Sequence, residues 1–405
     1  MSRTAAIGGR GWLLCQRDPA AAERLRAYKT MAWIDYFGDQ ERLVYDCLAM
    51  LNSSEQARFY VGAVLGSSAV GLIFDLVGLF GFARRYHDRA VTLTEGIEDA
   101  IAIARAHHLL GYHKLFIGEC DETLQSLRRA GEIYRGAGAL REWGAVEALI
   151  GWGLNTTRGE FDAALERSRG LVQMGQDGGD PQMIVWGFNI EATAERCFGH
   201  FESAESTSRA ALDLARSIPD YGAQAIAGAN LGCCHLRRGE LTEAIVTLEE
   251  TNHLIDERGF KGYEISLARN ALAEAYLAEA ERASGLARGR ALTNARRACR
   301  VALKHGHCFR GGLPAAMRSQ GTWAWLKGKH DTARRWWDRS LTVAQELGAQ
   351  YETAMTSLEI GRRLGEHELL ERAIQVFGEV RAESDLATAR ALRTHRGAMS
   401  TTKQT

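Results

Sequence analysis

Proline is scarce in this sequence. The 405 residues include only 4 prolines, whereas proline makes up about 5% of an average protein. Because proline interrupts helix interiors, its scarcity allows long uninterrupted helices. The 43 glycines, by contrast, exceed the usual share of about 7%. In a helical chain we expect them at turns and at close contacts between helices.

The sequence also lacks an excess of charge of either sign. Its 50 basic and 50 acidic residues give a formal net charge of zero. Nucleic-acid-binding proteins usually carry a basic excess or a basic stripe, and here the basic residues form only short clusters such as Arg334-Arg335. We therefore expect no nucleic-acid partner.

Signals for export are weak. The apolar run near the N-terminus is limited to residues 12–15, which is shorter than the roughly 7 residues that a signal peptide needs. The 8 cysteines are scattered and show no disulfide framework, a pattern that is usual for thiols in a reducing cytosol. These features predict a cytoplasmic protein.

One apolar run, residues 61–82, is long enough to span a bilayer. Two interpretations are open: a membrane-spanning helix, or a buried repeat helix followed by its turn. Asp75 lies well inside the run, where a charge would be costly in lipid. We favour the buried helix and expect no membrane contact, with the spanning helix as a minor alternative.

A repeat of about 40 residues organises the chain. The predicted turn glycines follow one another at spacings of 40, 40, 41, 40 and 40 residues, at Gly38, Gly78, Gly118, Gly159, Gly199 and Gly239. Gly328 occurs in the same context 89 residues beyond Gly239, and two slightly longer units would fill that gap. A fixed period of this size is typical of stacked helical repeats.

Each repeat is predicted to contain two helices. The first ends at the turn glycine, which can adopt the left-handed conformation that a helix C-terminus favours. The second carries a small residue five positions after that glycine, at Ala83, Ala164, Ala204, Ala244 and Ala333. A further glycine lies seven positions before the turn, at Gly71, Gly111, Gly232 and Gly321. Because a mid-helix glycine costs about 1 kcal/mol relative to alanine, its recurrence predicts close contact between helices.

The predicted fold is an all-α, right-handed superhelical solenoid of antiparallel helix pairs over residues 23–380. The repeat near residues 263–305 has a longer turn, residues 283–289, which we interpret as an insertion between the helices of one pair. We expect residues 1–22 to form a weakly structured N-terminal segment. Residues 381–405 end in a polar stretch without apolar periodicity, so we expect a partly disordered tail.

The order Leu231-Gly232, Gly239 and Ala244 resembles the tetratricopeptide repeat, although that family usually has about 34 residues per repeat. A second likeness covers roughly residues 25–378 and is carried by residues 295–299, 323–325 and 333–362. These stretches resemble the helical C-terminal region of large bacterial signalling ATPases, including adenylate-cyclase-associated proteins and regulators of the maltose-activator type. The resemblance implies a sensing or docking scaffold, although this sequence lacks the catalytic domains of those proteins.

No catalytic constellation is recognisable in the sequence. Gly328-Lys329-His330 has neither the glycine spacing nor the hydroxyl residue of a phosphate-binding loop. Residues 136–138 lack the third glycine of a dinucleotide-binding fingerprint. We therefore expect no enzyme activity and no cofactor.

Metal-ligating residue types occur close together near one connector, at Cys299, His305, His307 and Cys308. Thiolates and imidazoles suit zinc, but the spacing matches no finger-like pattern and Cys299 is predicted to lie inside a helix. The neighbouring Cys233 and Cys234 point to different helix faces, so we expect them to be packing residues. The sequence therefore predicts no metal site.

The first helices of stacked pairs line an inner, concave face. In the tetratricopeptide register, the positions that point into this groove are Asp75, Arg105, His108, Tyr112, Trp186, Asn189, Arg196 and Arg318. Their charged, amide and aromatic groups suit a peptide or a small ligand, and a solvated face without a ligand is an equal alternative.

The function that these features favour is a non-catalytic scaffold for protein interaction or regulation, with a protein or peptide partner in the groove. A solenoid that senses a small molecule or peptide is one alternative. An enzyme with an unrecognised site is the other.

Overall fold

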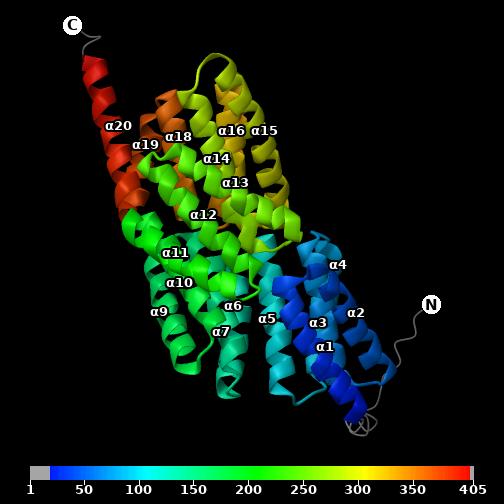
Figure 1. Cartoon of the computed structure of the whole chain (residues 1–405). Helices are drawn as coiled ribbons and strands as arrows, with labels where there is room; N and C mark the ends of the chain where they lie inside the picture. The colour runs from blue at the N-terminus through cyan, green and yellow to red at the C-terminus, as the bar shows by residue number, and fades with distance from the viewer. Residues whose placement is uncertain (1–18, 402–405) are drawn as a thin grey trace. The chain divides into compact units, whose positions relative to one another are not determined.

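The computed structural model describes residues 19–401, with the side chains of residues 19–394. Each element within this range is a helix, as Figure 1 shows. Most of the predicted N-terminal segment, residues 1–22, lies outside the described residues, and the first helix begins at Pro19.

Successive helices form antiparallel pairs, in which we call the two members the first and second helix. The pairs are α1 (Pro19–Gly38) with α2 (Gln40–Gln56), α3 (Tyr60–Leu76) with α4 (Phe80–Thr94), α5 (Ala100–Ile117) with α6 (Cys120–Gly136), the composite α7 (Leu140–Ala148), η2 (Leu149–Asn155) and α8 (Thr156–Arg158) with α9 (Phe161–Gly178), α10 (Pro181–Phe198) with α11 (Phe201–Ser217), α12 (Tyr221–Arg238) with α13 (Leu241–Arg258), α14 (Ser266–Arg282) with α15 (Gly285–Cys308), α16 (Leu313–Leu326) with α17 (His330–Glu346), and α18 (Gln350–Leu364) with α19 (His367–Glu379). Short 3-10 turns, η3 (Tyr263–Ile265) and η4 (Arg310–Gly312), precede α14 and α16, and α20 (Glu383–Thr401) ends the series.

The chain divides into two compact units. Unit 1 comprises Met1–Lys114 and Asp121–Val146, and unit 2 comprises Leu115–Cys120 and Glu147–Thr405. Unit 1 therefore contains α1 to α4 with most of α5, α6 and α7, and unit 2 contains η2 and all the helices that follow it. The same pairing of helices is present in both units, which confirms the predicted all-α repeat fold.

The predicted turn glycines have the expected conformation. Their φ angles lie between 72° and 98° at Gly78, Gly118, Gly159, Gly199, Gly239 and Gly328. This left-handed region is open to glycine without strain. Gly38 differs because it is the last residue of α1.

The small residues of the repeat lie where two helices touch. The five predicted alanines are 0% exposed. A Cβ atom added at Gly111 would lie 2.7 Å from the Leu127 side chain, and one at Gly232 would lie 2.5 Å from Leu248. Real Cβ atoms do not approach other atoms so closely, so the two helices can lie this near each other at these positions only because the first helix carries glycine there. This confirms the close contact that the recurring glycine predicts.

The long apolar run of residues 61–82 forms α3, a turn and the start of α4. Nearly all of α3 is buried within unit 1, as the interpretation of a buried repeat helix requires. Among the described helices, none combines the length and the apolar character needed to cross a membrane.

The insertion near residue 285 is accommodated differently from the prediction of a longer turn. α14 ends at Arg282 and α15 begins at Gly285, so the connection is short and the additional residues extend α15 to 24 residues. Leucine, alanine and arginine between residues 286 and 292 are strong helix formers. Their combined propensity outweighs the helix-breaking tendency of Gly285 and Gly289.

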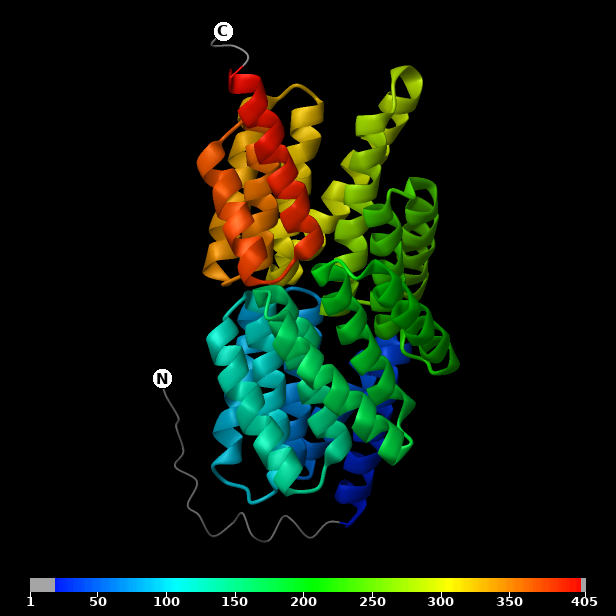
Figure 2. The same cartoon turned by 90° about the vertical axis from the view of Figure 1, so that its left-hand side faces the viewer.

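Most of the predicted partly disordered tail, residues 381–405, lies in α20. Figures 1 and 2 show α20 running alongside α19. Ala389 is fully buried in a core cluster that includes Leu370 and Phe377. The prediction rested on the polar composition of residues 394–405. Before these residues the sequence carries an apolar stripe, with Ala382, Leu386 and Ala389 at helical spacing. Residues 402–405 lie outside the described range.

Replacing Gly232 by alanine tests the close contact between helices. Alanine at an open helix position is more stable than glycine by about 1 kcal/mol, and Gly170→Ala should show this gain because its added Cβ meets no atom within 4 Å. At Gly232 the collision with Leu248 should reverse the sign and lower the free energy of unfolding by about 1–3 kcal/mol. Chemical denaturation of both variants measures the difference. A stabilised Gly232→Ala would contradict the packing.

A buried alanine of the repeat offers a second test. Ala244 is 0% exposed, so Ala244→Glu places an unpaired charge between helices and should cost about 3 kcal/mol or more. The matched control is Val246→Glu in the same helix, where the side chain is 49% exposed. Thermal and urea unfolding should separate the two variants clearly, and equal stability would show that the repeat is placed incorrectly there.

Candidate functional site

Two adjoining cavities, of about 130 Å³ and 300 Å³, lie among the first helices of unit 2. Both are lined by Leu236, Arg237, Glu274, Arg318 and Met355, and we call the two together the inner cavity. Its walls come from η2, α8, the start of α9, α10, α12, α14, η4, α16 and α18, with one side completed by Thr388 and Leu392 of α20.

One wall of the inner cavity is an irregular helix. η2 is a π-helix within the first helix of its pair, and π-helical turns occur frequently at functional sites. Trp152 of η2 lines the cavity, and its indole N–H donates to the Thr193 hydroxyl at 3.2 Å. Thr157 lines the same wall and donates to the Gly153 carbonyl at 2.6 Å. The irregular turn is thus held in place by side-chain hydrogen bonds.

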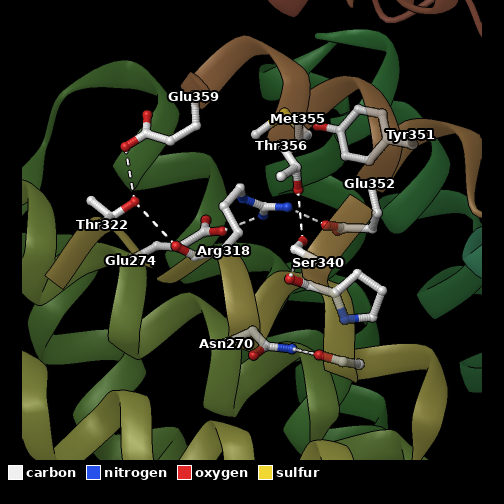
Figure 3. Close-up of polar contacts among 12 residues, drawn as sticks. Asn270, Glu274, Arg318, Thr322, Ser340, Tyr351, Glu352, Met355, Thr356 and Glu359 are labelled. Atoms are coloured by element: carbon white, nitrogen blue, oxygen red, sulfur yellow. Dashed lines mark hydrogen bonds and ion pairs between the residues drawn. The ribbon is translucent and has the colours of Figure 1, made fainter. Parts of the chain in front are cut away.

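Arg318 is the charged centre of the cavity, and its charge is compensated. Figure 3 shows its guanidinium between Glu274 and Glu352, which come from α14 and α18. The bond to Glu274 measures 2.7 Å. The Arg318 side chain is 8% exposed, and a charge so buried requires paired partners of this kind.

Arg237 is compensated by the C-terminal helix. Its guanidinium donates to Asp385 of α20 at 2.6 Å and to the Tyr351 hydroxyl at 3.2 Å. Burial raises the pKa of Tyr351, so the phenol keeps its proton and donates to Asp385 at 2.8 Å. Residues in the predicted tail therefore hold a cavity-lining arginine in position.

Arg196 lines the cavity without a compensating charge. Its Nε donates to the Asn230 side-chain oxygen at 3.1 Å, and Asn230 in turn donates to Thr193 at 2.9 Å. Within the described part of the chain, no carboxylate forms an ion pair with Arg196, and its two terminal nitrogens have no hydrogen-bond acceptor. The cavity consequently offers a fixed, half-buried cation to an anionic group.

Asn270 presents an unused acceptor to the same cavity. Its side-chain N–H donates to the Gly312 carbonyl at 3.1 Å, as Figure 3 shows. Its side-chain oxygen is buried and has no partner among the described residues. An orphaned buried oxygen costs about 1–3 kcal/mol, so a ligand N–H that reached it would recover this free energy.

The titratable residues that line the cavity are glutamates, arginines, cysteines and a tyrosine. Its described lining residues include neither histidine nor aspartate. Burial raises the pKa of the Cys197 thiol to about 11 and also raises that of Cys233, so neither is a ready thiolate nucleophile.

Two of the predicted groove residues, Arg196 and Arg318, line the inner cavity. Trp186 and Asn189 lie on the same helix as Arg196 but connect helices instead. The Trp186 indole donates to Asp220 at 3.2 Å, and the Asn189 amide donates to the Ala223 carbonyl at 3.0 Å.

The predicted groove residues of unit 1 are mostly interior. Asp75, His108 and Tyr112 are at most 5% exposed. The Tyr112 hydroxyl lies 2.6 Å from that of Tyr36, and the Arg105 guanidinium lies 5.8 Å above the Trp33 ring. Asp75, Tyr112 and Arg105 thus contact side chains from other helices of unit 1, whereas Nδ1 of His108 is buried without a hydrogen-bond partner.

Several cavity residues escaped the sequence analysis although a signal was present. Glu352, Met355, Glu359 and Arg362 line the cavity from one face of α18. Their spacings of 3, 4 and 3 residues match a helical stripe. Such a stripe of mixed charge and apolar residues is detectable in principle.

The residues considered for zinc, Cys299, His305, His307 and Cys308, do not belong to the group of close metal-ligating side chains found in the described residues. Burial raises the pKa of Cys299 to about 12 and lowers that of His305 to about 4. A group of metal-ligating residue types that the sequence analysis missed lies instead in unit 1, at Asp75, His87 and His113.

No protein-family profile and no curated protein match the sequence. Solved structures do match the fold. A Rap protein complexed with competence and sporulation factor superposes with a TM-score of 0.61 at 13% identity, covering 94% of this chain and 98% of that one. The Rap conjugation gene regulator of plasmid pLS20, in complex with a Phr peptide, has a TM-score of 0.56 at 10% identity, covering 80% and 97%.

A third structure, the apo form of RapI, has a TM-score of 0.50 at 11% identity and covers 70% of this chain and 98% of that one. The superpositions show that the fold is shared, and at identities this low they show the fold alone. The chain is therefore a helical-repeat protein with a tetratricopeptide-like fold.

Replacing Arg318 by methionine tests how much its ion pairs with Glu274 and Glu352 contribute to stability. The change leaves two half-buried carboxylates facing each other, and we expect the free energy of unfolding to fall by roughly 2 kcal/mol, below the 3–5 kcal/mol of a fully buried pair. The control Arg209→Met removes an exposed pair with Glu205 and should cost less than about 0.5 kcal/mol. Urea denaturation distinguishes the two, and equal effects would mean that the Arg318 network contributes little.

Proposed function

We propose that this protein is a non-catalytic helical-repeat scaffold that binds a peptide segment of a protein partner in the inner cavity of unit 2. The observation that carries the proposal is Arg196, a half-buried arginine without a carboxylate partner in a cavity whose neighbouring arginines are compensated. The fold adds support, because two Rap proteins of this fold have structures in complex with a competence and sporulation factor and with a Phr peptide.

Size favours a short, extended segment as the ligand. Cavities of about 130 Å³ and 300 Å³ accommodate a few side chains and no folded domain. An extended segment can place side chains in both cavities while its remaining length lies outside. Binding of this kind uses pockets for side-chain specificity and polar groups for orientation.

Two polar groups define what the segment should carry. A carboxylate would satisfy the free donors of Arg196 in a charge-assisted pair. A peptide N–H would satisfy the orphaned oxygen of Asn270. Trp152 and Phe309 supply apolar wall beside these groups, which suits an acidic group next to an apolar side chain.

A small molecule with the same two groups is the second candidate, and the modest volume of the cavity favours it. The two candidates differ in how much chain the ligand needs. A peptide should lose affinity when the residues that flank its carboxylate and its apolar side chain are removed. A small molecule makes all its contacts inside the cavity and needs no such flanking chain.

Selection from a displayed library of linear peptides tests the proposal. The wild-type protein should enrich acidic sequences, and Arg196→Glu should weaken their binding more than tenfold, because a like charge replaces the cation that receives the carboxylate. The control Arg335→Glu makes the same charge change on the exposed surface of α17 and should leave binding unchanged. Fluorescence anisotropy with a selected peptide measures both affinities.

The opposite results are equally informative. Equal binding by wild type and Arg196→Glu would remove the inner cavity from the binding site. If no peptide is enriched but a carboxylate metabolite raises the melting temperature of the wild type alone, the small-molecule function replaces the peptide-binding one, since a ligand of the folded state stabilises it.

A further inference from the structure

Three side chains from three helices converge inside unit 1. Asp75 lies near the end of α3, His87 in α4 and His113 in α5. One carboxylate oxygen of Asp75 lies 2.9 Å from Nε2 of His87, and the other lies 2.6 Å from Nδ1 of His113. The three possible ligand atoms lie within 4.8 Å of one another.

The cluster is sealed from solvent and has no other charge partner. The side chains of Asp75 and His87 are 0% exposed, and that of His113 is 2% exposed. In the described residues, Asp75 contacts no lysine or arginine. The remaining ring nitrogens, Nδ1 of His87 and Nε2 of His113, are buried without a hydrogen-bond partner. A buried carboxylate thus depends entirely on two imidazoles.

At all three positions the cluster differs from repeats that carry apolar residues there. Nine residues after the turn glycine, His87 takes the place of Leu127 and Leu248, and like them it packs against the mid-helix glycine. The position of Asp75, three residues before the turn glycine, is held by Leu115 in the next repeat and Leu236 further on.

His113 shows the same departure, because the position five residues before the turn glycine holds Ile73 and Leu154 in the neighbouring repeats. Other repeats carry polar residues at two of these positions, with Arg196 at the position of Asp75 and Ser168 and Ser208 at that of His87. What distinguishes this point of the chain is that three ligand-forming residues meet there, from three different helices.

We propose that Asp75, His87 and His113 form a binding site for a divalent transition-metal ion of the zinc class. Two imidazole nitrogens and one carboxylate oxygen are a donor set that suits such ions. The ion's positive charge would balance the buried carboxylate, and each neutral imidazole would carry its proton on the ring nitrogen that now lacks a partner. A site with three protein ligands leaves one tetrahedral position for a further ligand.

The required adjustment is small. Zinc lies about 2.0–2.2 Å from nitrogen and oxygen ligands, which places ligand atoms of a tetrahedral site roughly 3.3 Å apart. The present separations of 2.6 Å and 2.9 Å run to different carboxylate oxygens of Asp75 and would need to widen by about 0.7 Å and 0.4 Å. The ligand atoms lie within 4.8 Å of one another, so any pair farther apart than about 3.3 Å would need to come closer. Side-chain rotation within the cluster can provide this without moving a helix.

Cobalt(II) is the probe for the test, because it occupies zinc sites and absorbs visible light when bound. The full-length protein, freed of metal with a chelator, is titrated with cobalt(II) and then with zinc. The proposal predicts one equivalent of cobalt(II) with visible absorption bands that zinc abolishes. It also predicts a melting temperature several degrees higher with zinc than without it.

The variant Asp75→Leu/His87→Leu carries the residues that α5 and α6 have at the same repeat positions, so we expect it to fold and to take up no metal. His253→Gln, an exposed histidine elsewhere in the chain, is the matched control and should bind as the wild type does. His113→Gln changes a single ligand and alters the shape of the side chain less, and its cobalt(II) affinity should fall at least tenfold.

Absence of cobalt(II) bands in the wild type would overturn the proposal and leave a hydrogen-bonded packing cluster. So would undiminished uptake by both ligand variants. The outcome does not depend on the inner cavity of unit 2, since Arg196→Glu leaves all three ligands in place.

Discussion

The structure depends on one packing constraint, the close approach of the two helices in each pair. At Gly111 and Gly232 the first helix comes so near the second that no side chain fits between them. The contact fixes the rotation of the first helix about its own axis. One face of the first helix therefore packs against the second helix of its pair. The residues on another face point toward the first helices of neighbouring pairs. The inner cavity of unit 2 follows from this arrangement.

Electrostatics then determines what the inner cavity can bind. Charges placed in a partly buried cavity need partners, and Arg318 and Arg237 obtain them from α14, α18 and α20. Each pair joins helices that are distant in sequence, so the same contacts that neutralise the cavity also hold its walls together. Arg196 is the exception. Its hydrogen bond to Asn230 orients the guanidinium and leaves its charge available.

A repeat architecture also explains how Asp75, His87 and His113 can differ from the rest of the chain. Each pair of helices packs mainly on its neighbours, so one pair tolerates unusual residues without changing distant pairs. The side chain of His87 still fills the space beside a mid-helix glycine that Leu127 and Leu248 fill elsewhere. Packing and a metal-ligand arrangement are therefore compatible at one site.

The sequence by itself determined the repeat, its period and the close helix contacts, because these depend on local chemistry: glycine at left-handed turns and small residues at fixed intervals. It also directed attention to Arg196 and Arg318. The tertiary structure decided the rest. In the tertiary structure, α20 packs on the repeats and Asp385 binds Arg237. Residues expected to form a loop belong to α15, and Asp75 contacts two histidines. Pairing of polar side chains from different helices depends on distances that no spacing along one chain encodes.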